Sequence, residues 1–195
     1  MPTPWNDAVR VLRRDPHFGP LVKAVGPPVL RKPRESVFAS LAAAIVYQQL
    51  AGSAAMTIHG RFVAALGGRA TPGTVQAADP ERLRGAGLSR AKLAAILDLA
   101  EKATDGTLRL AGLSRLPDDE VMASLTRVRG IGPWTAEMFL MFHLHRPDVW
   151  PVGDLGVRAG WARIHGLQEP LDARGMGGVA DHLRPWRSAA AWYCW

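Results

Sequence analysis

Two parts of this sequence combine residue types that could do chemistry: the glycine turn Gly130-Ile131-Gly132 and, further along the chain, Asp154. The turn predicts a tight hairpin between two helices, because Pro133 suits the first position of a helix, where its missing N–H would have no partner. Glycine allows a left-handed φ and close approach of another backbone. The free N–H groups at such a helix start favour a bound phosphate. A plain interhelical turn would contain the same glycines.

Asp154 follows an extended apolar segment at 149–153 and precedes a predicted helix over 155–165. An aspartate in this position usually caps the helix, which contributes about 1 kcal/mol. The helix dipole and its N–H groups also stabilise an ionised carboxylate. Such an oriented carboxylate can stabilise developing positive charge or polarise a water molecule. On spacing alone, the cap remains the favoured interpretation.

The segments that must position these residues are all predicted to be helices. Apolar periodicity, caps and glycine stops predict helices over 36–48, 53–66, 80–85, 89–105, 118–126, 133–144, 155–165 and 185–195. The first 35 residues predict a short amphipathic stretch followed by a proline-rich loop. Strand-like alternation is nowhere convincing. The expected fold class is all-α.

Composition narrows the functional classes. The chain has 195 residues, is 48% apolar and has a net charge of +7, with arginines spread along its length. That balance favours a folded domain with a basic face, since arginine and lysine displace counterions from nucleic acid. The single cysteine, Cys194, excludes an internal disulfide and a four-cysteine zinc or iron–sulfur site within one chain. Without a signal peptide or a membrane-length apolar run, a cytoplasmic protein is expected.

Several short motifs occur in order from about residue 35 to the end. They are IVYQQL at 45–50, GLSRAK at 87–92, VRGIGPWTA at 128–136, WTAEMF at 134–139, PVGD at 151–154 and RPWRS at 184–188. Together they resemble the helix-hairpin-helix (HhH-GPD) DNA glycosylase superfamily, and within it the 3-methyladenine DNA glycosylase II family. Each motif is weak alone, but their shared order makes the resemblance specific.

The resemblance implies a single domain over 1–195: a compact, two-lobed helical bundle with a DNA-binding groove between the lobes. The hairpin would occupy about 118–145, and the first 35 residues leave no room for an N-terminal β domain. The implied activity is that of a monofunctional DNA glycosylase in base excision repair. It would flip alkylated purines (3-methyladenine, and 7-methylguanine as a further candidate) out of duplex DNA and hydrolyse them away, leaving an abasic site. Double-stranded DNA would be the partner, no membrane would be involved, and the protein would act as a monomer.

The resemblance also implies residue roles. Asp154 would be the catalytic aspartate, stabilising an oxocarbenium-like sugar and helping water attack C1′. The implied DNA-binding residues are Gly130, Ile131, Gly132, Thr135, Gln48, Gln49 and Leu50. Those at 48–50 would fill the gap left by the flipped nucleotide, although a plain loop is the alternative. The backbone carbonyls of Thr126, Val128 and Ile131 could ligate Na⁺ or K⁺; no other cofactor and no iron–sulfur cluster is expected.

An aromatic base pocket is expected, because a positively charged alkylated base stacks well on indole. The candidates are Tyr47, Trp134, Trp192 and Trp195, with Met138 lining the pocket. Ordinary core packing is an equal alternative for each of them. Trp134 stands where strand-cleaving relatives carry a lysine, and an indole cannot form a Schiff base.

Two departures from the family pattern stand out. Gly153 replaces a second acidic residue found in many relatives, and the sequence ends at Trp195, where relatives usually continue for several residues. Two other functions remain open: a non-catalytic binder of damaged DNA, and a glycosylase for deaminated or oxidised bases. A pure binder would not need Asp154 in a cleft, whereas the choice of base depends on pocket shape.

Overall fold

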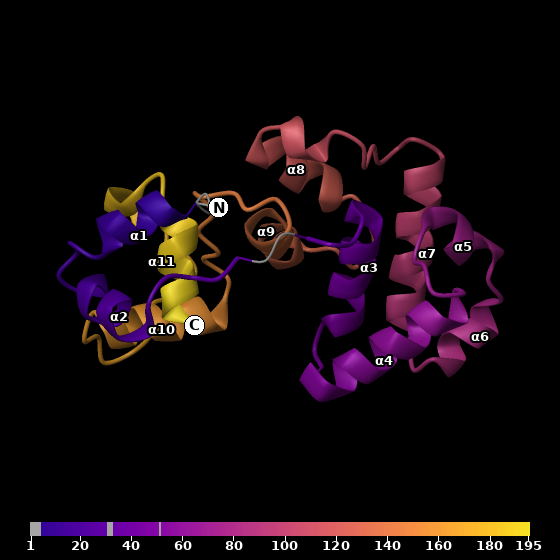
Figure 1. Cartoon of the computed structure of the whole chain (residues 1–195), viewed down its shortest axis with the longest axis horizontal. Helices are drawn as coiled ribbons and strands as arrows, with labels where there is room; N and C mark the ends of the chain where they lie inside the picture. Colours follow the sequence, from indigo (N-terminus) through magenta and orange to yellow (C-terminus); the bar gives the residue numbers. More distant parts are fainter. Residues whose placement is uncertain (1–4, 31–32, 51) are drawn as a thin grey trace. The chain divides into compact units, whose positions relative to one another are not determined.

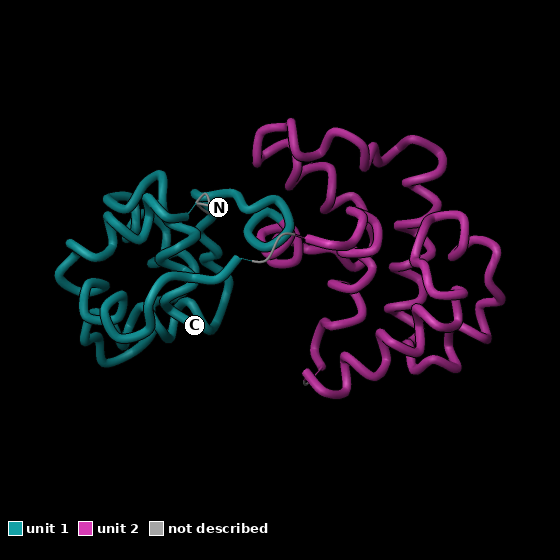
Figure 2. Tube along the Cα trace, viewed as in Figure 1, with its two compact units in different colours: residues 1–32, 140–195 teal, residues 33–139 magenta. Residues whose placement is uncertain are grey.

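The computed structural model of the chain describes residues 5–30, 33–50 and 52–195. Every regular element in these ranges is a helix, which confirms the all-α prediction (Figure 1). The chain forms two compact units: unit 1 comprises residues 1–32 and 140–195, and unit 2 comprises residues 33–139 (Figure 2). The boundary falls within one helix, α9 (Pro133–Phe142), which therefore contributes to both units.

Unit 2 is built around α7. Its elements are α3 (Val37–Tyr47), α4 (Gly52–Ala65), α5 (Pro72–Ala77), α6 (Pro80–Gly85), α7 (Arg90–Thr104), the 3₁₀ turn η1 (Leu113–Arg115), α8 (Asp118–Leu125) and the first part of α9. Helices α3, α5 and α6 all pack against α7, whose Ile96 and Leu99 are fully buried. The long central helix thus provides one rigid surface on which the rest of the unit assembles.

The helix starts in unit 2 follow local sequence signals. The hydroxyl of Ser89 accepts the N–H of Lys92 at 3.2 Å at the start of α7, and Asp79 caps α6 in the same manner. The sequence does not predict α5, because Pro72-Gly73 is typical of a turn. A capping box produces a short helix there instead: the Thr71 hydroxyl accepts the N–H of Thr74, and the Thr74 hydroxyl accepts the N–H of Thr71.

Unit 1 gathers segments from both ends of the chain. It contains α1 (Asn6–Leu12), α2 (Phe18–Val25), the end of α9, α10 (Leu155–Ile164), the 3₁₀ turn η2 (Asp181–Leu183) and α11 (Arg187–Cys194). Helix α11 packs against α1, α2 and α10. The sequence does not predict α2. Asp15 accepts the N–H groups of His17 and Phe18, and the buried Phe18 and Val22 fix this helix on the core.

Helices α10 and α11 approach each other unusually closely at Gly160. A Cβ at this position would lie 1.9 Å from the carbonyl oxygen of Cys194, so only glycine fits. The segment that leads into α10 is also tied to α11. The hydroxyl of the buried Ser188 accepts the N–H of Val149 at 2.8 Å and donates to the carbonyl of Arg146 at 2.7 Å.

An aromatic cluster fills the core of unit 1. The rings of Trp161 and His165 stack at 3.8 Å, and Trp150 meets Trp161 edge-on at 5.3 Å. The indole N–H of Trp150 donates to the carbonyl of the fully buried Met176 at 3.0 Å. These contacts fix the segment between the end of α9 and the start of α10.

We expect Gly160→Ala to destabilise the protein by about 1–3 kcal/mol or more, because the added methyl group must push α10 away from the α11 backbone. Gly60→Ala is the matched control. Gly60 lies inside α4 with open space around it, so alanine should stabilise the protein by about 0.4–1 kcal/mol. Thermal unfolding followed by circular dichroism measures both effects. Equal stability of the two variants would contradict the close approach.

We expect the protein to lose stability in mild acid because of His165. Burial lowers the pKa of His165; its hydrogen bond to the Trp161 carbonyl opposes that shift, and the nearby His17 adds to it. The folded protein therefore binds a proton less readily than the unfolded chain, whose histidines titrate near 6.5. The stability that neutral His165 contributes is therefore fully present above about pH 6.5, and it is lost as the pH falls through the pKa of His165 in the folded protein.

Urea unfolding of the wild type and His165→Phe at several pH values tests this dependence. The phenyl ring keeps the stacking on Trp161 and removes the titrating group, so the variant should lose less stability between pH 7.5 and 5. Parallel pH profiles of the two proteins would refute the assignment.

Candidate functional site

Asp154 is the N-cap of α10, as the sequence predicts. Its backbone is extended, and its Oδ1 accepts the backbone N–H of Val157 at 2.7 Å. The residue is 8% exposed, so the carboxylate is almost completely buried at the positive end of the helix dipole. Burial and the hydrogen bond together fix its orientation.

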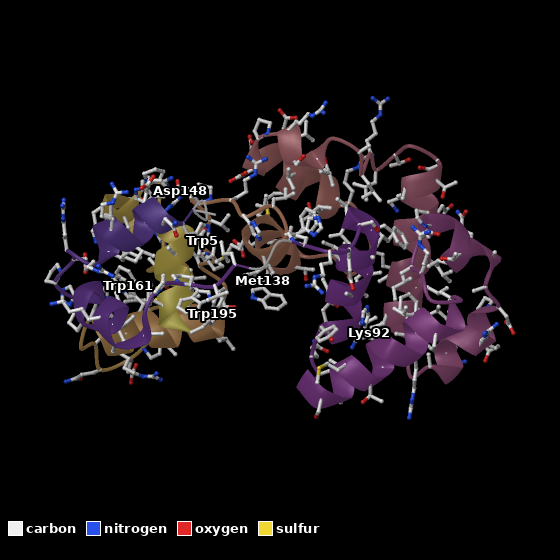
Figure 3. The ribbon with its side chains drawn as sticks, viewed as in Figure 1. Trp5, Lys92, Met138, Asp148, Trp161 and Trp195 are labelled. Carbon is white, nitrogen blue, oxygen red and sulfur yellow. The ribbon has the colours of Figure 1, made fainter. Side chains whose placement is uncertain are left out.

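A second donor reaches the same carboxylate oxygen from the residue that follows α11. The indole N–H of Trp195 donates to Oδ1 of Asp154 at 2.8 Å, and the Trp195 ring also contacts Phe142 with centroids 5.7 Å apart. Trp195, labelled in Figure 3, is 47% exposed. A Cβ on Gly156 would lie 2.6 Å from the Trp195 ring, so glycine at this position leaves space for the indole.

Cys194 lies beside this site but cannot supply a nucleophile at neutral pH. Burial raises the pKa of its thiol to about 12, and the negative charge of Asp154 acts in the same direction. Since the thiolate is the reactive form, the sulfur is chemically inert here. Cys194 is therefore not a candidate nucleophile.

The hairpin lies in unit 2, where α8 ends at Leu125 and α9 begins at Pro133. Gly130 has φ +76°, and a Cβ there would lie 3.0 Å from the Cβ of Ala95 on α7. A left-handed backbone at both glycines is not observed: Gly132 lies outside that region, and a Cβ on it would meet open space.

Hydrogen bonds join the hairpin directly to the turn that follows α3. The side-chain amide of Gln48 donates to the carbonyl of Gly130 at 2.9 Å and to the hydroxyl of Thr135 at 3.1 Å. The structure thus brings together two segments that the sequence assigns separately to DNA binding. The residues Thr135 and Ile131 are buried, so their side chains are not accessible to a ligand.

Two charged residues of α7 complete this arrangement. The ammonium group of Lys92 donates to the carbonyls of Val46 and Gln48 at 2.7 and 2.8 Å, and a carboxylate oxygen of Asp98 accepts the N–H of Arg129 at 2.8 Å. Sequence reasoning assigns neither a role. One sequence feature could have indicated a role for Lys92: it lies four residues before the buried Ile96, and therefore on the apolar face of the helix.

The predicted pocket residues are distributed over both units. Tyr47, Trp134 and Met138 belong to unit 2, and Trp192 and Trp195 belong to unit 1. Core packing, the alternative to a pocket role, does not apply to Tyr47. This residue is the last of α3 and is 39% exposed, and its ring lies 5.8 Å from that of His59. Trp134 is about half-exposed, which leaves part of its indole accessible to a ligand.

Within the part of the chain that the structure describes, no group of three or more histidine, cysteine, aspartate or glutamate side chains could hold a metal ion. Over the same residues, no helix is both long and apolar enough to cross a membrane.

Comparisons with known proteins agree with these features. A family model described as "HhH-GPD superfamily base excision DNA repair protein" matches residues 42–175. The chain is 33% identical over 186 residues to DNA-3-methyladenine glycosylase 1 of Schizosaccharomyces pombe, covering 93% of this chain and 82% of that protein.

Two solved structures are similar over nearly the whole chain. A 3-methyladenine DNA glycosylase of Schizosaccharomyces pombe in complex with abasic DNA superposes with a TM-score of 0.87 at 33% identity, covering 97% of this chain and 95% of that one. A DNA-3-methyladenine glycosidase from Bacillus halodurans gives 0.85 at 32% identity, covering 96% and 87%. This chain therefore belongs to the HhH-GPD superfamily of base excision DNA repair proteins.

Proposed function

We propose that the protein is a monofunctional DNA glycosylase that flips alkylated purines, 3-methyladenine and 7-methylguanine, out of duplex DNA and hydrolyses the bond to the sugar. Family membership supports the reaction class, and similarity to relatives named for 3-methyladenine supports the substrate. The observation that carries the proposal is the carboxylate of Asp154, buried at the N-terminus of α10 and held by two N–H donors.

The chemistry requires that carboxylate. As the bond from C1′ to the base nitrogen breaks, its electron pair leaves with the base, and positive charge develops on the sugar. An oriented anion stabilises this charge, and it can accept a proton from the water that attacks C1′. The products are a free base and an abasic site. Alkylation already places positive charge on the base, so little further help to the leaving group is needed.

The side chains near the hairpin support hydrolysis without strand cleavage. A lyase needs a neutral amine that can attack the sugar, and Trp134 occupies the position at which strand-cleaving relatives carry that lysine. The two lysines of α7 are engaged elsewhere. Lys92 donates to two backbone carbonyls, and Lys102 forms an ion pair with Asp98.

We assign DNA binding to the hairpin backbone around Gly130, Ile131 and Gly132, with the 48–50 turn filling the space left by the flipped nucleotide. The carbonyls of Thr126, Val128 and Ile131 are proposed ligands for Na⁺ or K⁺. The Val128 carbonyl accepts the N–H of Ile131 at 3.0 Å and retains a second lone pair for such an ion. The base would stack on one or more of Tyr47, Trp134, Met138, Trp192 and Trp195.

We expect Asp154→Asn to reduce single-turnover release of methylated purines by about 10²–10³-fold or more, because the anion that stabilises the sugar is lost. Asparagine can still accept the Val157 N–H and cap α10, so folding and DNA affinity should remain close to wild type. Quantifying the released base by chromatography and DNA binding by fluorescence anisotropy separates the two effects. Wild-type turnover by the variant would remove Asp154 from its role.

The two hairpin glycines give a second prediction. In Gly132→Ala, the methyl group would project into open space where a phosphate would approach, so we expect DNA affinity to fall about tenfold, roughly 1.4 kcal/mol, without a loss of stability. Gly130→Ala should also lower stability, by about 1–2 kcal/mol, because alanine is strained at φ +76°. Unchanged affinity of Gly132→Ala would show that this turn does not contact phosphate.

The same assay separates the alternative functions. A panel of duplexes carrying alkylated, deaminated or oxidised bases identifies the substrate class from the base that is released. Release of only deaminated or oxidised bases would keep the mechanism and replace the substrate. Tight binding of damaged DNA without release of any base would identify a non-catalytic binder.

A further inference from the structure

We propose that α7 holds the 48–50 turn and the hairpin in a fixed register, and that Lys92 is the positioning residue on which this register depends. The inference rests on the proposed function, because it concerns how that function handles a paired base. Lys92, labelled in Figure 3, lies wholly within unit 2, as do all its partners.

Lys92 closes the C-terminal end of α3. The last carbonyls of a helix have no partners inside it and carry the negative end of the dipole. The Lys92 ammonium group donates to the carbonyl of Val46 within the last turn of α3 and to that of Gln48 just beyond it, at 2.7 and 2.8 Å. One cation therefore satisfies two carbonyls on either side of Tyr47.

This contact lies next to a strained residue. Gln49 has φ +55°, a conformation that is unfavourable for a residue other than glycine. Such a conformation persists only where the surroundings determine it. Gln48, immediately before it, is held by its carbonyl through Lys92 and by its side chain through Gly130 and Thr135.

The hairpin is fixed to the same helix. Asp98, further along α7 than Lys92, accepts the N–H of Arg129 at 2.8 Å and forms an ion pair with Lys102. Between these two sites, Ala95 packs closely on Gly130: a Cβ at Gly130 would lie 3.0 Å from the Cβ of Ala95. Helix α7 thus contacts both DNA-binding segments, and Gln48 joins them directly.

This arrangement matters most when a base must be extruded. Filling the gap in the duplex requires the turn to be in place while the hairpin holds the phosphate backbone. A pre-ordered turn avoids the entropy loss of ordering it during that step. The hydrogen bonds of Lys92 go to two backbone carbonyls of unit 2, so its loss should impair extrusion and leave hydrolysis of an already unpaired base largely intact.

A competing explanation is that Lys92 acts as a phosphate ligand. Each phosphate contact contributes a slope of about −0.9 to the dependence of log affinity on log salt concentration. A positioning residue contributes nothing to that slope. Arg90→Gln, which removes an exposed charge two residues away on the same helix, is the matched control for a purely electrostatic effect.

The test uses the full chain with Lys92→Met, which keeps the alkyl stem and removes the donors. Single-turnover release of one alkylated purine is compared in two duplexes, with the lesion opposite its normal partner or opposite an abasic site. We expect a loss of about tenfold or more with the paired lesion and little change with the unpaired one. Lys92→Arg should retain most activity, and Arg90→Gln should show no dependence on pairing.

Hydrogen exchange provides a readout that does not depend on catalysis. In Lys92→Met, the amides of residues 48–50 and 129–131 should exchange faster, while the core of α7 remains protected. Lys92→Gln replaces methionine if that variant does not fold. Equal losses on both duplexes, unchanged exchange, or a reduced salt slope would each overturn the proposal. Wild-type protein that releases no base would refute the proposed function, and the exchange measurement would still decide the role of Lys92.

Discussion

The buried carboxylate of Asp154 is the feature on which the proposed chemistry depends. Its Oδ1 accepts one N–H from α10 and one from Trp195. The second donor is in reach because α11 packs directly on the backbone of α10 at Gly160, and because Gly156 leaves space for the indole. Two glycines of one helix therefore determine how this carboxylate is held. The packing of α11 on α10 in unit 1 therefore also sets the position of the carboxylate on which the proposed chemistry depends.

In unit 2, the corresponding feature is that the hairpin and the 48–50 turn are held in one conformation. A hairpin and an interhelical turn would be mobile if they were held only by their own residues. Contacts from Lys92, Ala95 and Asp98 attach both to the longest helix of the unit. The two proposed DNA-binding segments can then be short and can use backbone atoms for binding, because α7 supplies the rigidity.

The sequence predicts local features well and long-range ones poorly. Caps at Ser89 and Asp154, the hairpin glycines and the all-α class follow from neighbouring residues, and the structure contains them. Helix α2 is missed because its formation depends on burying Phe18 in a core assembled from distant segments. The hydrogen bond between Trp195 and Asp154, and the contacts of Lys92, join residues tens of positions apart, and no local pattern encodes them.

The central claim is that one oriented carboxylate releases the base by hydrolysis while the strand remains intact. The most direct measurement is a single-turnover incubation with duplex DNA methylated at purines, in which free base, abasic sites and strand breaks are quantified separately. The account predicts equal amounts of free base and abasic sites, with no strand breaks above background. Strand breaks that accumulate together with the released base, or bound DNA that releases none, would contradict it.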